Sequence, residues 1–395
     1  MSGPHPTRPR RAADRFVVLV ALVFLFTPAV AFAVGVRATS FENRRLTPLP
    51  EADSGWAFFT GLPAWATDHL PLRERAVHAA DAISQHVFSD PLGTGPGVTT
   101  QDGYPAVVVG RDGYWYLGDD FRLKCETTVP LSMIVRQLNR LDDALRASGR
   151  TLIVVEAPDK STMMPEHLPA ETPGKACARA RSAATRRAMH RVPAFLDLRP
   201  GLREAAADSP WPMYMPKDTH WDGPGAAEMV RQIVLRTDPA VAATFAPRDA
   251  GVSPRVADLA TLLGRDDEED FHIVTLAAPS VEPSKTALKE PSEVPQHVHA
   301  VGPPGTVVTT PTTLLGDSFT SASATVFAGT YADLTILNHR AAGLAPATTV
   351  DAIVSAQTVV LELVERDLAV GNSYVFQDAF VDAVSAAVAA APRSP

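Results

Sequence analysis

The strongest constraint on the fold is an alternation of short apolar runs with helix-like patterns that starts near residue 129. Apolar runs of strand length stand at 152–155, 194–198, 314–315, 334–337 and 359–363. Between 131 and 145, apolar residues recur every three or four positions, and Gly149 follows as a helix stop. Strands that alternate with helices indicate an α/β fold with a mostly parallel sheet and helices on both faces.

The N-terminus predicts a membrane-associated segment. Residues 16–34 carry no charge and are numerous enough to cross a bilayer. Four arginines precede them, which favours a cytoplasmic 1–15 and a single-pass signal-anchor over 16–36, with the rest of the chain extracytoplasmic. The small-x-small triplet at 31–33 resembles a cleavage site. A cleaved signal peptide, leaving a secreted or periplasmic protein, therefore stays open.

Two further regions follow from local patterns. We expect residues 37–124 to form an N-terminal extension that packs on the core. Within it, an Asp-Gly turn at 112–113 between two apolar runs predicts a β-hairpin. We expect 125–395 to be the catalytic domain, with an irregular insertion at about 266–311, where an acidic run and many prolines interrupt the pattern.

Composition narrows the function classes. The net charge is −8, and no basic stripe with interleaved aromatics is present, so we expect no nucleic-acid partner. The two cysteines, Cys125 and Cys177, suit one disulfide in an oxidising compartment, although two free thiols remain an alternative. They lack the spacing of a zinc site, and we expect neither a metal nor a cofactor.

Two short motifs suggest Ser/His/Asp acyl-transfer chemistry. Gly316 and Asp317 form a turn that delivers Ser318 from a strand to the start of a helix, with free N–H groups beside it as oxyanion donors. Upstream, His220 can act as the base, and Asp218 can hold its ring. Each motif alone has ordinary explanations, such as a common turn or a core histidine. Because no G-x-S-x-G elbow is present, an α/β-hydrolase of that type is disfavoured.

Four other residues are weaker candidates for substrate binding. Lys160 lies on a strand-exit loop, either facing the cleft or exposed. Tyr214 and Trp221 form either a sugar-stacking wall or part of the aromatic core. Arg366 binds either an anionic group or a neighbouring glutamate.

The chain resembles the AlgX/AlgJ type of SGNH-hydrolase-like polysaccharide O-acetyltransferases, because ordered segments match over most of its exported part. The segments are Glu42-Asn43-Arg44, Asp68-His69-x-Pro71-Leu72-Arg73, Gly110-Arg111-Asp112-Gly113-Tyr114, Pro158-Asp159-Lys160-Ser161, Tyr214, Asp218-Thr219-His220-Trp221, Leu315-Gly316-Asp317-Ser318-Phe319 and Glu362-x-x-Glu365-Arg366. The Asp-x-His precedes the serine, as in this family, whereas ordinary SGNH hydrolases place an Asp-x-x-His after the serine. The resemblance implies an SGNH-hydrolase-like, flavodoxin-like fold, with Ser318 as nucleophile, His220 as base and Asp218 as the orienting carboxylate.

The resemblance also implies a function. The protein would be an extracytoplasmic enzyme that moves acetyl groups onto a secreted or cell-wall polysaccharide, as in alginate biosynthesis, through an acetyl-serine. A membrane-bound O-acyltransferase would supply the acetyl group. The polymer need not be alginate, because no appended carbohydrate-binding module is evident. A carbohydrate acetyl-esterase with the same triad and a non-catalytic glycan-binding scaffold are the alternatives.

Overall fold

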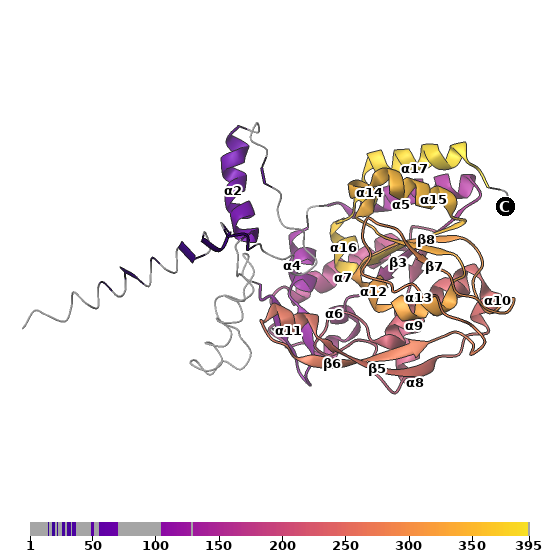
Figure 1. The fold of residues 1–395 in the computed structure, drawn as a ribbon, viewed down its shortest axis with the longest axis horizontal. Helices are drawn as coiled ribbons and strands as arrows, with labels where there is room; N and C mark the ends of the chain where they lie inside the picture. The colour runs from indigo at the N-terminus through magenta and orange to yellow at the C-terminus, as the bar shows by residue number, and fades with distance from the viewer. Residues whose placement is uncertain are drawn as a thin grey trace, which may run out of the picture. The chain divides into compact units, whose positions relative to one another are not determined.

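A computed structural model of the chain describes residues 104–127 and 129–393, with 49–50, 55–69 and scattered residues between 15 and 36. The chain divides into two compact units, 1–97 with 262–265, and 98–261 with 266–395. In the first unit, the helix α2 spans Trp56–Asp68 (Figure 1). Most of the expected signal-anchor at 16–36 lies outside the described residues. Among those that are described, none belongs to a helix of the length and apolarity that a bilayer crossing needs.

The second unit is built on a six-stranded sheet with the strand order β4-β3-β10-β8-β9-β7. All neighbouring strands are parallel except β7, which pairs antiparallel with β9 at one edge. Every residue of β10, in the interior of the sheet, is buried. The predicted, mostly parallel α/β sheet is thus confirmed. The strands are β3 (Thr151–Ala157), β4 (Phe195–Asp197), β7 (Gln296–Val298), β8 (Thr312–Gly316), β9 (Leu334–Asn338) and β10 (Thr358–Val364).

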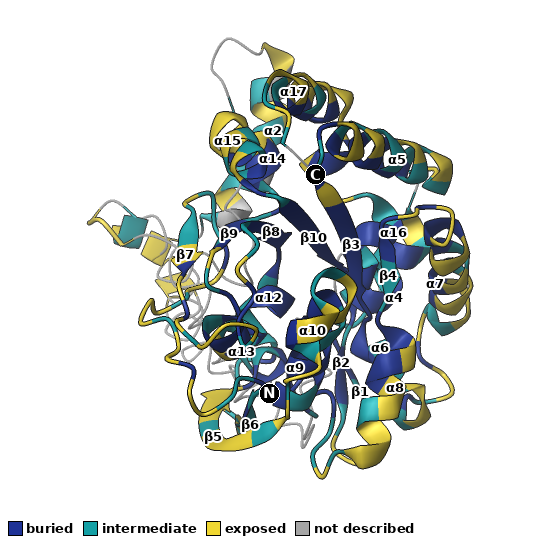
Figure 2. Cartoon of the chain, turned by 90° about the vertical axis from the view of Figure 1, so that its right-hand side faces the viewer, coloured by how far each residue is buried: buried dark blue, intermediate teal, exposed yellow. Residues whose placement is uncertain are grey.

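Helices cover both faces of this sheet, as expected, because successive strand residues point to opposite sides (Figure 2). Leu361 of β10 packs in one core cluster with α5 (Leu131–Ala147) and α17 (Asp378–Ala390). Val360, its neighbour, packs in a second cluster with α9 (Gly223–Thr237). The apolar runs therefore belong to strands that are buried on both faces.

The remaining helices are mostly short, and several follow strand ends. They are α6 (Lys160–Met163), η1 (Pro165–His167), α8 (Arg199–Asp208), α10 (Pro239–Ala242), α11 (Asp258–Leu262), α12 (Ser318–Ala322), α13 (Ala324–Thr330), α14 (Ala341–Leu344), α15 (Pro346–Ser355), α16 (Glu365–Val370) and η2 (Tyr374–Phe376).

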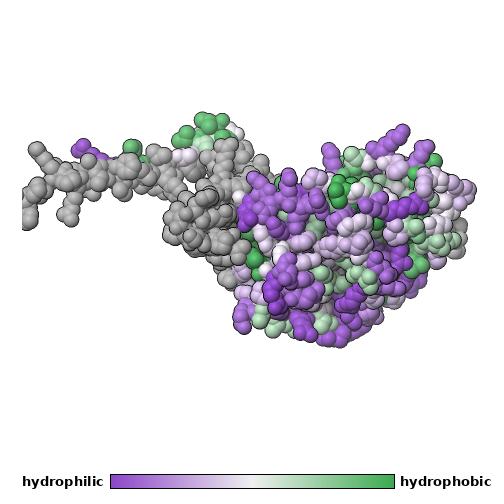
Figure 3. Space-filling model, turned by 90° about the horizontal axis from the view of Figure 1, so that it is seen from below, coloured by the Kyte–Doolittle hydropathy of each residue, from purple (hydrophilic) through white to green (hydrophobic). Residues whose placement is uncertain are grey.

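The region 266–311 is more regular than expected. It carries β7, and it also carries β6 (Glu268–Thr275), which pairs antiparallel with β5 (Arg248–Val256). Acidic residues occupy the start of β6, whereas Phe271 and Val274 are buried. A strand that begins with acidic, solvated residues does not form a continuous apolar run in the sequence. For this reason, β6 was not predicted within the segment 266–311. From the side on which this ribbon lies, hydrophilic surface surrounds smaller hydrophobic patches (Figure 3).

The second unit also starts before the expected boundary between residues 124 and 125. The predicted hairpin is present as β1 (Val107–Val109) and β2 (Trp115–Leu117). After it, α4 (Asp119–Glu126) is tied to α7 (Lys175–Met189) by a disulfide between Cys125 and Cys177. The hairpin and α4 belong to the second unit. A boundary between 124 and 125 would cut through α4, and the second compact unit begins at residue 98.

Candidate active site

Ser318 is the first residue of α12, directly after β8. Asp317 caps this helix, because its Oδ1 accepts the Phe319 N–H at 2.8 Å. Gly316 leaves no room for a side chain, since a Cβ there would lie 2.1 Å from Thr320 Oγ1. Ser318 itself is half-buried, and its hydroxyl has no hydrogen-bond partner among the described residues. The turn therefore presents a free serine hydroxyl at the carboxyl end of a parallel strand.

A buried carboxyl group supports this turn from β10. Glu362 Oε2 accepts the Asp317 N–H at 3.0 Å and the Thr320 hydroxyl at 2.8 Å. Burial, together with the charge of Asp317, raises the pKa of Glu362 well above its usual range, which favours its neutral form. Asp317 Oδ2 accepts the Val364 N–H at 2.8 Å. Both oxygens of Asp317 are thus engaged in holding the turn.

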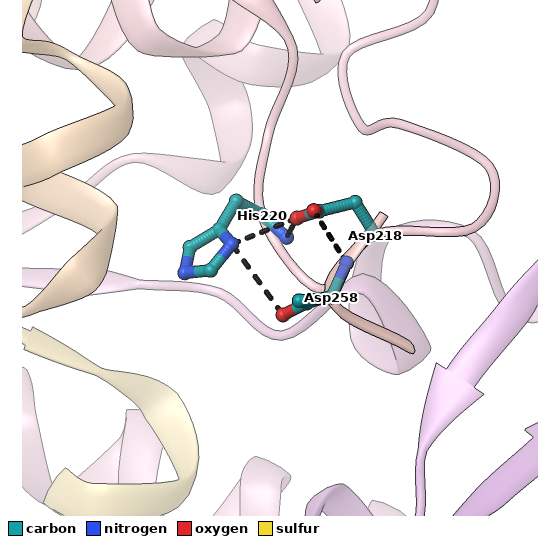
Figure 4. A group of neighbouring side chains, drawn as sticks. All are labelled: Asp218, His220 and Asp258. Atoms are coloured by element: carbon teal, nitrogen blue, oxygen red, sulfur yellow. Dashed lines mark hydrogen bonds and ion pairs between the residues drawn. The ribbon is translucent and has the colours of Figure 1, made fainter. Parts of the chain in front are cut away.

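Asp218 and His220 lie on the loop before α9 and face each other (Figure 4). His220 donates from Nδ1 to Asp218 Oδ1 at 2.8 Å, and its backbone N–H donates to the same oxygen at 2.9 Å. Asp218 Oδ2 accepts the Asp258 N–H at 3.0 Å. The other ring nitrogen of His220, Nε2, is buried and has no partner among the described residues. This orientation leaves Nε2 as the atom that can take a proton.

The charges of the loop favour an ionised aspartate beside the imidazole. Burial would raise the pKa of Asp218, but the charge and hydrogen bonds of His220 outweigh it and hold that pKa at about 2. Burial would lower the pKa of His220, but the carboxylates of Asp218 and Asp258 raise it above its usual value. The arrangement therefore stabilises a protonated imidazole, the form that follows proton uptake by a base.

The structure brings the histidine loop and the serine helix together around Phe319. The rings of His220 and Phe319 have centroids 5.0 Å apart. The Trp221 indole N–H donates to the Phe319 carbonyl at 3.1 Å, and the two rings meet edge to face. Since Phe319 follows Ser318 directly, two motifs that are distant in the sequence meet at one end of the sheet.

Lys160 is neither exposed nor in the cleft. Its side chain is buried, and Nζ donates to the carbonyls of Met215, Pro216 and Asp218 at 2.9, 2.8 and 2.6 Å. Burial lowers the pKa of Lys160 to about 8, against the raising effects of Asp258 and Asp218. Lys160 therefore fixes the loop that carries the histidine, and the expectation of an exposed loop lysine is corrected.

The other three substrate-binding candidates are also structural. Tyr214 is fully buried and donates to the Pro158 carbonyl at 2.6 Å, and Trp221 is fully buried against Phe319. Neither forms a sugar-stacking wall. Arg366 pairs with Asp159 at 2.8 Å and with Asp120 at 3.4 Å, and these aspartates replace the glutamate partners that we expected. These partners lie too far away in sequence for local patterns to indicate them.

Asp258 is the residue that sequence reasoning missed. It has no motif around it, and only the fold brings it beside His220. Nitrogen and oxygen atoms of Asp218, His220 and Asp258 lie within 4.8 Å of one another, a spacing that a metal ion could use. Hydrogen bonds within the group already account for this closeness.

Two cavities of about 510 Å³ lie away from these residues. One is lined by parts of α8, α9, β5 and β6, including Trp211, and the other by parts of the segment 275–288 and α13. Asp218, His220 and Ser318 line neither cavity.

Several solved structures resemble this one at low sequence identity. The O-acetyltransferase domain of Pseudomonas putida AlgJ is 17% identical, with a TM-score of 0.47, covering 71% of this chain and 99% of that chain. Pseudomonas aeruginosa AlgX is 15% identical, with a TM-score of 0.47, covering 73% and 71%. Bacillus cereus PatB1 is 10% identical, with a TM-score of 0.43, covering 69% and 98%.

Comparison with protein families gives a more direct assignment. No curated protein matches the chain. Residues 107–363, well over half of the chain, match the family model described as the SGNH hydrolase-like domain of acetyltransferase AlgX. The match includes the hairpin, the histidine loop, the serine turn and β10 up to Leu363. The chain therefore belongs to the family of AlgX-type SGNH hydrolase-like domains.

Proposed function

We propose that this protein is an extracytoplasmic O-acetyltransferase that moves an acetyl group onto hydroxyls of a polysaccharide through an acetyl-Ser318 intermediate. One observation carries the proposal. His220 is oriented by Asp218, keeps Nε2 free of hydrogen bonds within the described residues, and packs against the residue that follows Ser318. Membership in the AlgX-type family supports the same reaction class.

In the first half-reaction, His220 Nε2 takes the proton of Ser318 Oγ as that oxygen attacks the acetyl carbonyl carbon. The carbonyl oxygen becomes an oxyanion, to which the backbone N–H of Ser318, at the start of α12, would donate. The tetrahedral intermediate then collapses, and the imidazolium returns its proton to the departing oxygen of the donor. Acetyl-Ser318 and a neutral His220 remain.

In the second half-reaction, a sugar hydroxyl gives its proton to His220 and attacks the acetyl carbonyl. Collapse of this intermediate breaks the bond to Ser318 Oγ, which regains its proton from the imidazolium. If water attacks instead, the same residues perform hydrolysis, and the protein is an acetyl-esterase. The two outcomes differ only in which hydroxyl reaches the acyl-enzyme.

The proposal includes a donor and a location. A membrane-bound O-acyltransferase brings the acetyl group across the membrane, and the segment 16–36 keeps the catalytic unit at the outer face or directs its secretion. The Cys125–Cys177 disulfide supports an oxidising compartment of this kind. The acceptor is a secreted or cell-wall glycan.

The decisive experiment compares Ser318→Ala with Ser321→Ala, a matched change within the same helix. With an activated acetyl ester, we expect Ser318→Ala to lose turnover by on the order of 10³-fold or more and Ser321→Ala to retain it. Mass spectrometry after rapid quenching should find the acetyl group on the Ser318 peptide. Undiminished turnover in a folded Ser318→Ala variant rejects the proposal. Product analysis with and without an oligosaccharide acceptor separates transfer from hydrolysis.

A further inference from the structure

Asp258 contacts each residue of the Asp218-Thr219-His220 segment. Its Oδ1 accepts the Thr219 N–H at 2.7 Å, and its own N–H donates to Asp218 Oδ2 at 3.0 Å. Its Oδ2 lies 3.7 Å from His220 Nδ1, on the side of the ring where Asp218 also lies (Figure 4). A single residue at the start of α11 thus braces the backbone, the carboxylate and the imidazole of the loop.

We propose that Asp258 is a positioning residue for His220 in acyl transfer, acting as a second carboxylate that fixes the ring and stabilises its protonated form. The inference rests on the proposed function above. With two carboxylates on the Nδ1 side, a flipped ring would lose the hydrogen bond to Asp218 and the contact with Asp258. The geometry therefore favours one ring orientation.

Several charges face this group and set the size of the effect. His220 is acted on by Asp218 and Asp258, which favour its protonated form, and by Arg366, which opposes it. Lys160 lies beneath the same loop and is in turn acted on by Asp258. The Asp258 side chain is 39% exposed and that of Asp218 is 9% exposed, so water screens Asp258 more strongly. At 3.7 Å from Nδ1, the charge of Asp258 still favours the protonated form of His220.

The substitution Asp258→Asn separates the effect of the negative charge from that of the hydrogen bonds of Asp258. Asparagine keeps the side-chain oxygen that accepts the Thr219 N–H, and it keeps the backbone N–H that donates to Asp218. The negative charge is lost, and an amide NH2 group takes the place of Oδ2, which faces His220 Nδ1. Asp258→Ser, with a hydroxyl in place of the carboxylate, removes the same charge and serves as the second variant if Asp258→Asn does not fold.

The test measures His220 directly. NMR titration of the full chain labelled with ¹⁵N-histidine, with His220→Gln used to assign the signal, gives the pKa of His220 in wild type and variants. We expect Asp258→Asn to lower this pKa and to shift the acid limb of kcat/KM to lower pH. Asp351→Asn, at an exposed position in α15, should move neither.

The two hypotheses fail differently. An unchanged His220 pKa and an unshifted acid limb in Asp258→Asn overturn the role of Asp258, whatever the activity of the Ser318 variant. Full turnover in Ser318→Ala, combined with the expected pKa shift, rejects acyl transfer through Ser318 and leaves the electrostatic contact standing. Loss of plateau kcat in Asp258→Ser, with KM unchanged, supports the positioning role.

Discussion

His220 Nδ1 lies 2.8 Å from Asp218 Oδ1, and this bond leaves the opposite nitrogen, Nε2, without a partner in the described part of the chain. An imidazole that donates on one side accepts on the other. The free acceptor is on a ring that packs against Phe319, next to Ser318. The hydrogen bond to Asp218 therefore fixes Nε2 as the proton-accepting nitrogen of a ring that packs beside the serine helix.

The first prediction concerns pH. Burial would lower the pKa of His220, but Asp218 and Asp258 raise it above its usual value of 6.5. Because only the neutral ring can accept a proton, activity is lost as pH falls through this raised pKa. We expect kcat/KM for an acetyl ester to rise with pH, with a midpoint above 6.5. A profile with its midpoint at or below that value contradicts the assigned base.

The second prediction concerns Lys160. In Lys160→Met, the carbonyls of Met215, Pro216 and Asp218 lose their shared donor. We expect the free energy of unfolding to fall by roughly 1–3 kcal/mol, because buried acceptors are left unpaired. We also expect kcat to fall about tenfold or more as the His220 loop loosens.

A matched control for this variant is Lys175→Met. Lys175 Nζ donates to the Pro169 carbonyl at 2.9 Å, away from the loop. Denaturant unfolding and steady-state kinetics on both variants compare the two positions. Equal kinetics in the two variants would show that Lys160 does not position the base.

The third prediction concerns Gly316. A Cβ at this position would lie 2.1 Å from Thr320 Oγ1 and 2.8 Å from Leu314 Cδ2. We expect Gly316→Ala to destabilise the fold by roughly 1–3 kcal/mol and to displace the Ser318 turn. Adding Thr320→Ala removes the nearest atom, so the double variant should be less destabilised than the sum of the single changes.

The control for the glycine is Gly329→Ala in α13, where the added Cβ would meet only Ala277 Cβ at 3.3 Å. Urea unfolding of the four variants, with turnover measured beside it, tests the explanation. A Gly316→Ala variant as stable as Gly329→Ala would mean that the serine turn tolerates the side chain.

The sequence allowed much of the central sheet to be predicted, because its strands are buried on both faces and stand out as apolar runs. Strand β6 was not predicted because it begins with acidic residues. It is recognised as a strand only from its pairing with β5. The site divides in the same way. Asp218 and His220 are two residues apart and form a recognisable motif, whereas Asp258 reaches them only through folding of the chain.

Long-range pairing also explains the corrected roles. Lys160 and Arg366 carry charges that suggest contact with a ligand. Their actual partners are carbonyls 55 or more positions away for Lys160 and an aspartate 207 positions away for Arg366. Local sequence patterns do not indicate partners that are so far apart along the chain. A buried structural cation and a substrate-binding cation therefore cannot be told apart from the sequence.

The position of β10 in the sheet determines when the fold can be completed during synthesis. It is the last strand to be synthesised, yet it lies between β3 and β8, and it carries Glu362, which holds the turn before Ser318. Until the ribosome has released residues 358–364, two interior strands have unpaired edges that invite association with other chains. A chain shortened before this point loses the middle of its sheet and the support of its serine together. We therefore expect a fragment that ends before residue 358 to lack acyl-transfer activity.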